Sequence, residues 1–318
     1  MNLYPWQEKA WLKLKQENAK QHHAILFIGP LGSGLERLAK TFATSLICRN
    51  LTDTKKACGK CQDCQWILTE HPNLKVVNNE AKEGSSKNIS IESIRNLKKF
   101  FELSSHIIGG NKVILINNTE SLTLNAANAL LKILEEPPEN SYLILTTDNI
   151  SSLLPTIVSR CLIFSAPRPS REEAESFLKV EGFESLSSQL PLFNNLPLDV
   201  IAHRGDSDLF IIIINEFKKG KDFELMAIEP KWLAGYFTET ICLLQKWLYE
   251  IFLFKMTTKF HFFESNKENI KKLSDAADIT KLLNMLKSVN KIKLISKKPI
   301  NKDISFDNLM VEYRNVFK

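Results

Sequence analysis

The chain has 318 residues, of which 44% are hydrophobic and 25% charged, a composition that suits two or three ordinary globular domains of about 100–150 residues each. Its formal net charge of +6 permits an acidic partner such as DNA without requiring one. The longest apolar runs, such as residues 209–214, are too short to cross a membrane, and the first residues lack the charged and apolar regions of a signal peptide.

A loop of the phosphate-binding type follows the first predicted strand. The apolar run 24–28 predicts that strand, and the pattern from 38 to about 48 predicts a helix after the loop. The loop contains three glycines, Gly29, Gly32 and Gly34. Glycines let the backbone turn tightly and bring its N–H groups close to a phosphate. Leu35 and Glu36 replace the lysine and the hydroxyl that serve phosphate and magnesium. We therefore expect the loop to keep its shape, to lack its chemistry and to be empty.

Four cysteines in the next segment predict a metal site. Cys58, Cys61 and Cys64 form two overlapping C-x-x-C spacings, a pattern that presents thiolates to tetrahedral zinc. Cys48 is the nearest fourth ligand, and His71 is the second choice for that position. Free surface thiols and an iron–sulfur cluster are the alternatives. Because four protein ligands leave no open position for a catalytic water, we expect structural Zn2+ in a module at 48–64. Cysteines used for metal binding, and not for disulfides, also predict a cytoplasmic protein.

The chain continues with predicted helices that alternate with predicted strands. One helix is predicted from 89 to about 103, and the small residues and leucines of 125–138 predict another, which a proline pair stops. Buried strands are predicted at the apolar runs 113–116 and 142–145, and a last strand is predicted at 162–164. This alternation predicts a doubly wound α/β sheet.

The tip of the strand at 113–116 lacks the acidic residues that a nucleotide hydrolase places there. In such enzymes one carboxylate holds the magnesium sphere and another activates the attacking water. Here the tip carries Asn117 and Asn118, whose neutral amides cannot act as a general base. Together with the missing loop lysine, this second loss predicts that the chain does not hydrolyse ATP.

Several motifs resemble those of the delta-prime subunits of bacterial DNA polymerase III clamp loaders, which belong to the AAA+ family. The motifs are Trp6-Gln7, His23-Ala24, the four cysteines, the run 125–138 and Ser159-Arg160-Cys161. The similarity is strong over 1–165 and rests on helical pattern and length beyond about 170. It implies three domains. The first is a AAA+ P-loop-type parallel core at 1–166, which includes the zinc module at 48–64. A helical lid domain at 167–207 and a C-terminal helical collar domain at 208–318 follow.

The resemblance also implies a function. Such a subunit is a non-catalytic stator, accessory to a DNA-directed DNA polymerase, that joins gamma/tau and delta subunits in a hetero-pentamer. The pentamer loads the sliding clamp onto primed DNA during replication. Arg160 would point as an arginine finger into the ATP site of a neighbouring subunit and stabilise charge on the transferred phosphoryl group. The alternative for Arg160 is a surface ion pair, for instance with Glu135 or Glu136.

Two other functions compete with this interpretation. A gamma/tau-like clamp-loader ATPase would share the motifs, although such subunits keep the loop lysine and the acidic strand tip. A zinc-dependent nucleic-acid-binding module would use the α/β core as a scaffold. ATP turnover by the isolated chain would favour the first, and salt-sensitive DNA binding that is lost on cysteine substitution would favour the second.

Overall fold

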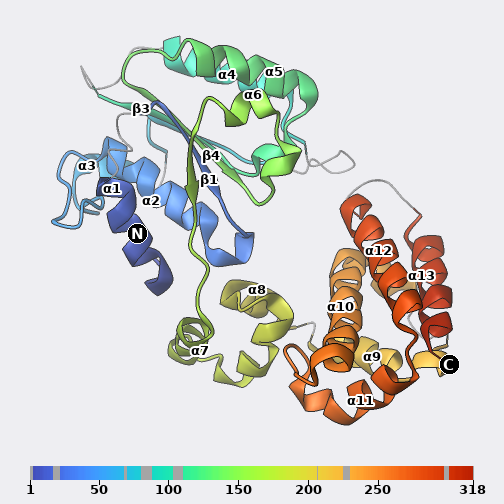
Figure 1. Ribbon diagram of the computed structural model, residues 1–318. Coiled ribbons are helices and arrows are strands. Elements are labelled where there is room, and N and C mark those ends of the chain that lie inside the picture. The colour runs from blue at the N-terminus through green and yellow to red at the C-terminus, as the bar shows by residue number, and fades with distance from the viewer. Residues whose placement is uncertain are drawn as a thin grey trace. The chain divides into compact units, whose positions relative to one another are not determined.

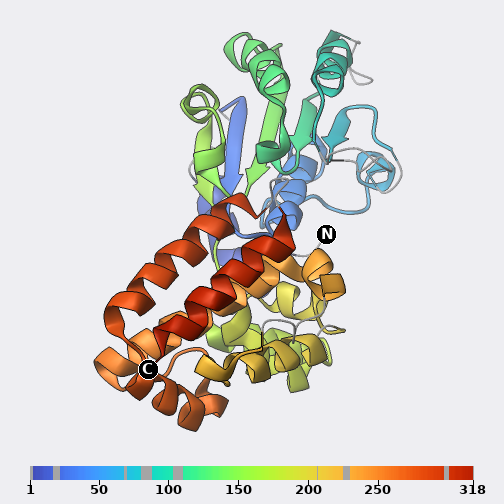
Figure 2. The same cartoon turned by 90° about the vertical axis from the view of Figure 1, so that its right-hand side faces the viewer.

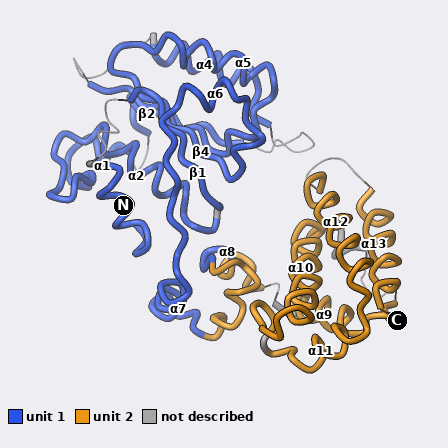
Figure 3. Tube along the Cα trace, viewed as in Figure 1, with its two compact units in different colours: residues 1–184, 196–199 blue, residues 185–195, 200–318 orange. Residues whose placement is uncertain are grey.

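The computed structural model describes residues 3–16, 22–67, 70–79, 88–102, 110–205, 207–224, 230–296 and 301–317. The chain divides into two compact units (Figures 1 and 3): unit 1 comprises residues 1–184 and 196–199, and unit 2 comprises residues 185–195 and 200–318. The expected division into three domains stays a prediction.

The core of unit 1 is a five-stranded parallel sheet with the strand order β2-β3-β4-β1-β5. Its strands are β1 (Ala24–Ile28), β2 (Leu74–Val77), β3 (Lys112–Ile116), β4 (Ser141–Thr147) and β5 (Leu162–Ser165). Strand β1 lies between β4 and β5, so that Ile25 is opposite both Ile144 and Leu162. The four predicted strands are confirmed. Strand β2 at the sheet edge is missed by the sequence analysis, because Lys75 interrupts its short apolar run.

Helices cover both faces of the sheet (Figures 1 and 2). The helical segments of unit 1 include η1 (Pro5–Gln7), α1 (Glu8–Gln16), η3 (Leu31–Ser33), α2 (Leu35–Ile47), α3 (Gln62–Trp66), α4 (Ile91–Glu102), η4 (Thr119–Ser121), α5 (Leu124–Glu135), η5 (Ile150–Ser152), α6 (Pro155–Val158) and α7 (Arg171–Val180). Ile25 and Phe27 pack in the cluster that includes α1 and α2, whereas Ala24 and Leu26 pack with α4 and α5. Because successive side chains of a strand point to opposite faces and both faces are covered, the strand is apolar throughout. The predicted α/β class is confirmed.

Local sequence explains where the helices begin and end. Helix α2 begins after Gly34, whose φ of 79° lies in the left-handed region that favours glycine. The hydroxyl of Thr123 accepts a hydrogen bond from the N–H of Ala126 and caps α5. Helix α5 ends at Glu135, just before the proline pair. Helix α4 begins at Ile91, two residues after its predicted start, because Ile89 forms a β-bridge with Leu122; residue 103, the predicted end, lies outside the described residues.

In its described residues, unit 2 contains helices and no strand. Segments η6 (Glu184–Phe193) and α8 (Pro197–Ala202) lie at the division between the units, and α9 (Ser207–Phe217), η7 (Gly220–Asp222), α10 (Pro230–Thr257), η8 (Glu264–Asn266), α11 (Lys267–Ala276), α12 (Ile279–Ile295) and α13 (Lys302–Val316) follow. Helices α10, α12 and α13 lie side by side (Figures 1 and 2). At their centre the indole N–H of Trp247 donates to the hydroxyl of Tyr313 at 2.9 Å, and that hydroxyl donates to the carbonyl of Phe217. A search of the described helices finds none with the length and apolar content that a bilayer crossing needs.

Candidate functional site

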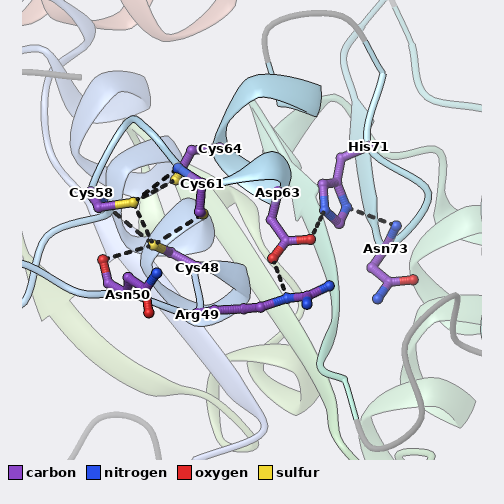
Figure 4. A network of polar contacts seen from close by, with 9 residues as sticks. All are labelled: Cys48, Arg49, Asn50, Cys58, Cys61, Asp63, Cys64, His71 and Asn73. Atoms are coloured by element: carbon purple, nitrogen blue, oxygen red, sulfur yellow. Dashed lines mark hydrogen bonds and ion pairs between the residues drawn. The ribbon is translucent and has the colours of Figure 1, made fainter.

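The four predicted cysteine ligands meet in one cluster beside the sheet (Figure 4). Their sulfur atoms all lie within 4.8 Å of one another. The distances from Cys48 Sγ to Cys58 Sγ and Cys61 Sγ are 3.7 and 3.8 Å, and Cys58 Sγ lies 3.9 Å from Cys64 Sγ. Four sulfurs placed about 2.3 Å from a central zinc ion in a tetrahedron would be about 3.8 Å apart. The donor set and its spacing therefore fit a four-coordinate metal ion.

Two parts of the chain build this cluster. Cys48 follows the last residue of α2, and the other three cysteines lie on the short insertion that contains α3. The backbone turns at Gly59, whose φ is 71°, so that the N–H groups of Lys60 and Cys61 point at Cys58 Sγ at 3.4 and 3.3 Å. These N–H groups lower the pKa of Cys58 to about 6. Burial raises the pKa of Cys48 and of Cys64, a cost that a bound cation offsets by its charge.

Three charged or polar side chains next to the cluster form a connected network (Figure 4). Arg49 Nε donates to Asp63 Oδ2 at 2.8 Å, and His71 Nε2 lies 3.5 Å from Asp63 Oδ1. The side chains of Asp63 and His71 are fully buried. His71, the second choice for the fourth ligand, therefore lies outside the four-sulfur set and contacts Asp63.

The phosphate-type loop keeps its fold and is closed by other parts of unit 1. The Trp6 indole N–H and the Gln7 amide donate to the carbonyl of Ser33 at 2.9 and 3.0 Å. A methyl group built on Gly32 would lie 2.3 Å from the carboxylate carbon of Asp199, and one on Gly34 would lie 2.4 Å from the Tyr4 ring.

The other residues of the loop agree with this closed arrangement. A methyl group on Gly29 would lie 3.0 Å from the Ala166 side chain. Leu35, in the position of the missing lysine, is fully buried in the core cluster that contains α2. The three glycines therefore permit close contacts with the protein itself.

Amides occupy the tip of β3, where a hydrolase would have carboxylates, and a hydroxyl from β4 lies beside them. Asn117 Nδ2 donates to Asn78 Oδ1 at 2.9 Å, and Asn118 Nδ2 donates to Asn79 Oδ1 at 3.3 Å. The hydroxyl of Thr146 lies 3.4 Å from Asn117 Oδ1. These contacts give the amides a role in joining neighbouring segments, and none of the groups in them carries charge.

Arg160 lies just after α6, and its guanidinium is held by two acceptors. Its Nη2 lies 2.8 Å from Glu135 Oε1, and its Nη1 donates to the carbonyl of Thr156 at 2.9 Å. The Arg160 side chain is 36% exposed and that of Glu135 is 49% exposed. Within unit 1, Arg160 therefore makes the surface ion pair that was the alternative to a role in a neighbouring subunit.

The sequence analysis missed two contributors, Asp63 and Tyr4. Asp63 stands between two cysteines of the cluster, and an acid at such a position was a usable signal. Tyr4 contacts the loop from a segment about 30 residues away in the chain, and no local pattern predicts such a contact. Asp199 was expected only by resemblance, as the residue that stands about where active relatives carry an arginine that contacts nucleotide.

The parallel sheet with its phosphate-type loop and the cysteine cluster agree with the AAA+ clamp-loader class that the resemblance implies. Residues 6–170 match the family described as "DNA polymerase III, delta subunit". The chain belongs to this family, and the expected resemblance to delta-prime subunits is confirmed by the relatives below.

Curated relatives named "DNA polymerase III subunit delta′" come from several bacteria. The protein of Pseudomonas aeruginosa is 38% identical over 202 residues, which cover 62% of this chain and 60% of that protein. The protein of Yersinia pestis is 38% identical over 165 residues (51% and 47%), and that of Escherichia coli is 31% identical over 185 residues (57% and 54%). The chain thus spans about half to three-fifths of the length of these relatives.

Among solved structures, a gamma subunit-related protein of DNA polymerase III from Thermotoga maritima is similar with a TM-score of 0.47 and 17% identity, covering 96% of this chain and 99% of that one. The clamp loader delta protein of Bacillus subtilis gives a TM-score of 0.35 and 11% identity, covering 96% and 99%. These values add nothing to what the sequence relationship establishes.

Proposed function

We propose that this protein is a non-catalytic stator subunit of the DNA polymerase III clamp loader, and so an accessory subunit of a DNA-directed DNA polymerase. It joins gamma/tau and delta subunits in a hetero-pentamer, which loads the sliding clamp onto primed DNA. Membership of the delta subunit family and the names of the curated relatives support this role. A replication role and six cysteines that are all free thiols support a cytoplasmic location.

The observation that carries the non-catalytic role is a folded phosphate-type loop without any catalytic group. Leu35 is buried in the core, so no cation stands where the loop lysine would neutralise phosphate. The Asp199 carboxylate lies against Gly32, and its charge repels a triphosphate. Asn117 and Asn118 at the strand tip offer no general base.

Arg160 acts in the ATP site of a neighbouring subunit. Its ion pair with Glu135 is half exposed, and pairs of this kind are worth only about 0–1 kcal/mol. A triphosphate is a better acceptor for a planar guanidinium, because it offers more charge and several oxygens. Breaking the ion pair between Arg160 and Glu135 therefore costs little free energy. The released guanidinium then stabilises the charge of the transferred phosphoryl group.

The four cysteines hold structural zinc. Such an ion supplies folding free energy to a segment that has no core of its own, and it performs no chemistry when four protein ligands fill its coordination sphere. The sulfur spacing around 3.8 Å supports this assignment. The helices that follow form a lid at 167–207 and a collar domain at 208–318 that joins the partner subunits.

The test is the ATPase rate of the reconstituted clamp loader with clamp and primed DNA. We expect Arg160→Ala to slow hydrolysis at one ATP site by about a thousandfold or more, while the complex still assembles. Arg171→Ala is the matched control, because Arg171 is also an exposed arginine in an ion pair, with Glu175 at 2.8 Å. Normal hydrolysis and clamp loading by the Arg160 variant would leave this protein an architectural role at most.

A second measurement separates the stator from a gamma/tau-like ATPase. The isolated chain is incubated with ATP and Mg2+, and phosphate release is followed. We expect no turnover above that of a buffer blank. Turnover that disappears when the chain's own loop is altered would identify an active ATPase instead.

A further inference from the structure

We propose that Asp63, held by Arg49 and His71, keeps the four cysteines in place and determines how slowly the cluster releases its metal ion. Asp63 would be a positioning residue, because it lies outside the four-sulfur set and acts through the segments that carry the ligands. The inference rests on the metal site proposed above and adds to it three side chains outside the ligand set.

The first half of the network joins the two ligand-bearing parts of the chain. Arg49 follows the ligand Cys48 at the end of α2, and Asp63 stands directly before the ligand Cys64 in α3. Their 2.8 Å contact therefore fixes α3 against the end of α2. Helix α3 has only five residues, too few for a helix that stands alone in water. Its position depends on such contacts and on the metal.

The second half joins α3 to the edge of the sheet. The N–H of Asn73 donates to His71 Nδ1 at 3.0 Å, so in the neutral ring the proton lies on Nε2, which faces Asp63 Oδ1 at 3.5 Å. Asn73 in turn accepts a hydrogen bond from the N–H of Val113, the second residue of β3, at 2.9 Å. Asp63 is thus connected through His71 to the central sheet.

Burial of the Asp63 carboxylate costs desolvation free energy, which its contacts with Arg49 and His71 must offset. Its side chain is fully buried, and a buried carboxylate is tolerated when it is paired and hydrogen-bonded. Replacing Arg49 or His71 leaves the buried Asp63 carboxylate with fewer partners, whereas the Arg49 side chain is 56% exposed and stays in contact with water. Loss of the carboxylate therefore frees α3, and with it Cys61 and Cys64, to move away from Cys48 and Cys58.

The experiment measures zinc release from the full chain to an excess of a chromogenic chelator. Asp63→Asn keeps the size of the side chain and removes its charge. We expect this variant to release zinc about 10-fold faster or more, the effect typical of residues that support metal ligands. The matched control is Asp53→Asn, an exposed acid in the same insertion, which should release zinc at the native rate.

Two further variants separate positioning from general stability. His71→Gln keeps an N–H donor at the place of Nε2 and should release zinc more slowly than His71→Leu, which has no donor. Arg49→Ala combined with Asp63→Asn should release zinc no faster than Asp63→Asn alone, because both changes remove the same contact. If the network served stability alone, the variants would have lower free energies of unfolding, but their zinc release rates would not follow the order given above.

The proposal is overturned if folded Asp63→Asn releases zinc at the native rate. If that variant does not fold, Arg49→Ala decides in its place, and a native release rate there overturns the proposal equally. A native chain purified without stoichiometric metal would overturn both this inference and the zinc assignment. The role of Arg160 would be untouched by that result, since it is measured by ATP hydrolysis in the complex.

Discussion

The guanidinium of Arg160 and the carboxylate of Glu135 form an ion pair of 2.8 Å at the surface of unit 1, and both side chains are at least one-third exposed. Glu135 is the last residue of α5, and Arg160 follows α6. The pair joins the two motifs that carry the strongest resemblance to clamp-loader subunits. Whether Arg160 serves this pair or a neighbouring ATP site can be decided by changing its partner.

Glu135→Ala should leave ATP hydrolysis by the reconstituted loader near the native rate, whereas Arg160→Ala should reduce it. The reason is that the triphosphate, and not Glu135, is the proposed acceptor for the guanidinium. Glu135→Ala should also change the free energy of unfolding by less than about 1 kcal/mol, the range for exposed pairs. Glu136→Ala serves as control in both assays, since Glu136 is the neighbouring exposed acid. Equal loss of activity in the Glu135 and Arg160 variants would assign Arg160 to the ion pair.

Leu35→Lys restores the lysine of the phosphate-type loop and should nevertheless give no ATP hydrolysis by the isolated chain. The strand tip still lacks a carboxylate, and Asp199 still lies against Gly32. The variant should lose about 2 kcal/mol of stability or more in urea unfolding, because Leu35 is fully buried and a charge there is desolvated. Leu12→Lys, at a side chain that is 50% exposed, should have little effect. Hydrolysis by the Leu35 variant would mean that the missing lysine is the only defect of the ATP site, which contradicts the prediction.

Removal of the metal should destabilise unit 1. Cys64→Ser should lose the bound zinc measured by atomic spectroscopy, because serine does not replace a thiolate ligand. Its melting temperature should fall by about 5 °C or more, since each kcal/mol corresponds to roughly 2–4 °C in a unit of this size. Cys242→Ser in α10 is the control and should keep both metal and stability, because Cys242 lies outside the cluster. Full zinc content in the Cys64 variant would contradict the ligand assignment.

Glu250 should be the most sensitive acidic residue of unit 2 among those the structure describes. It is fully buried in α10, and its carboxylate accepts hydrogen bonds from the N–H groups of His261, Phe262 and Phe263 at 2.8, 3.1 and 3.3 Å. Glu250→Ala leaves these donors buried without an acceptor and should cost about 3 kcal/mol or more. Glu268→Ala, at an exposed position of α11, should change stability by less than about 0.5 kcal/mol. Similar urea midpoints for the two variants would show that the loop finds other acceptors.

The sequence alone predicted those features of the chain that are local. The apolar runs at 24–28 and 113–116 predicted two buried strands, because a strand covered on both faces must be apolar along its whole length. The spacing of Cys58, Cys61 and Cys64 predicted the thiol cluster, because its turn geometry lies within seven residues. The missing loop lysine at Leu35 and the missing acid at Asn117 were likewise predicted from single positions in the sequence.

The tertiary structure decided every relationship between segments that are distant in the chain. It supplied the strand order, the edge strand β2, and the choice of Cys48 over His71 beside the other sulfurs. It also brought Asp199 against Gly32 and Arg160 to Glu135. Sequence periodicity reports only which face of an element is apolar. Which elements then pack together depends on long-range burial of those faces, and the contacts of Asp63 and Arg160 are consequences of that packing.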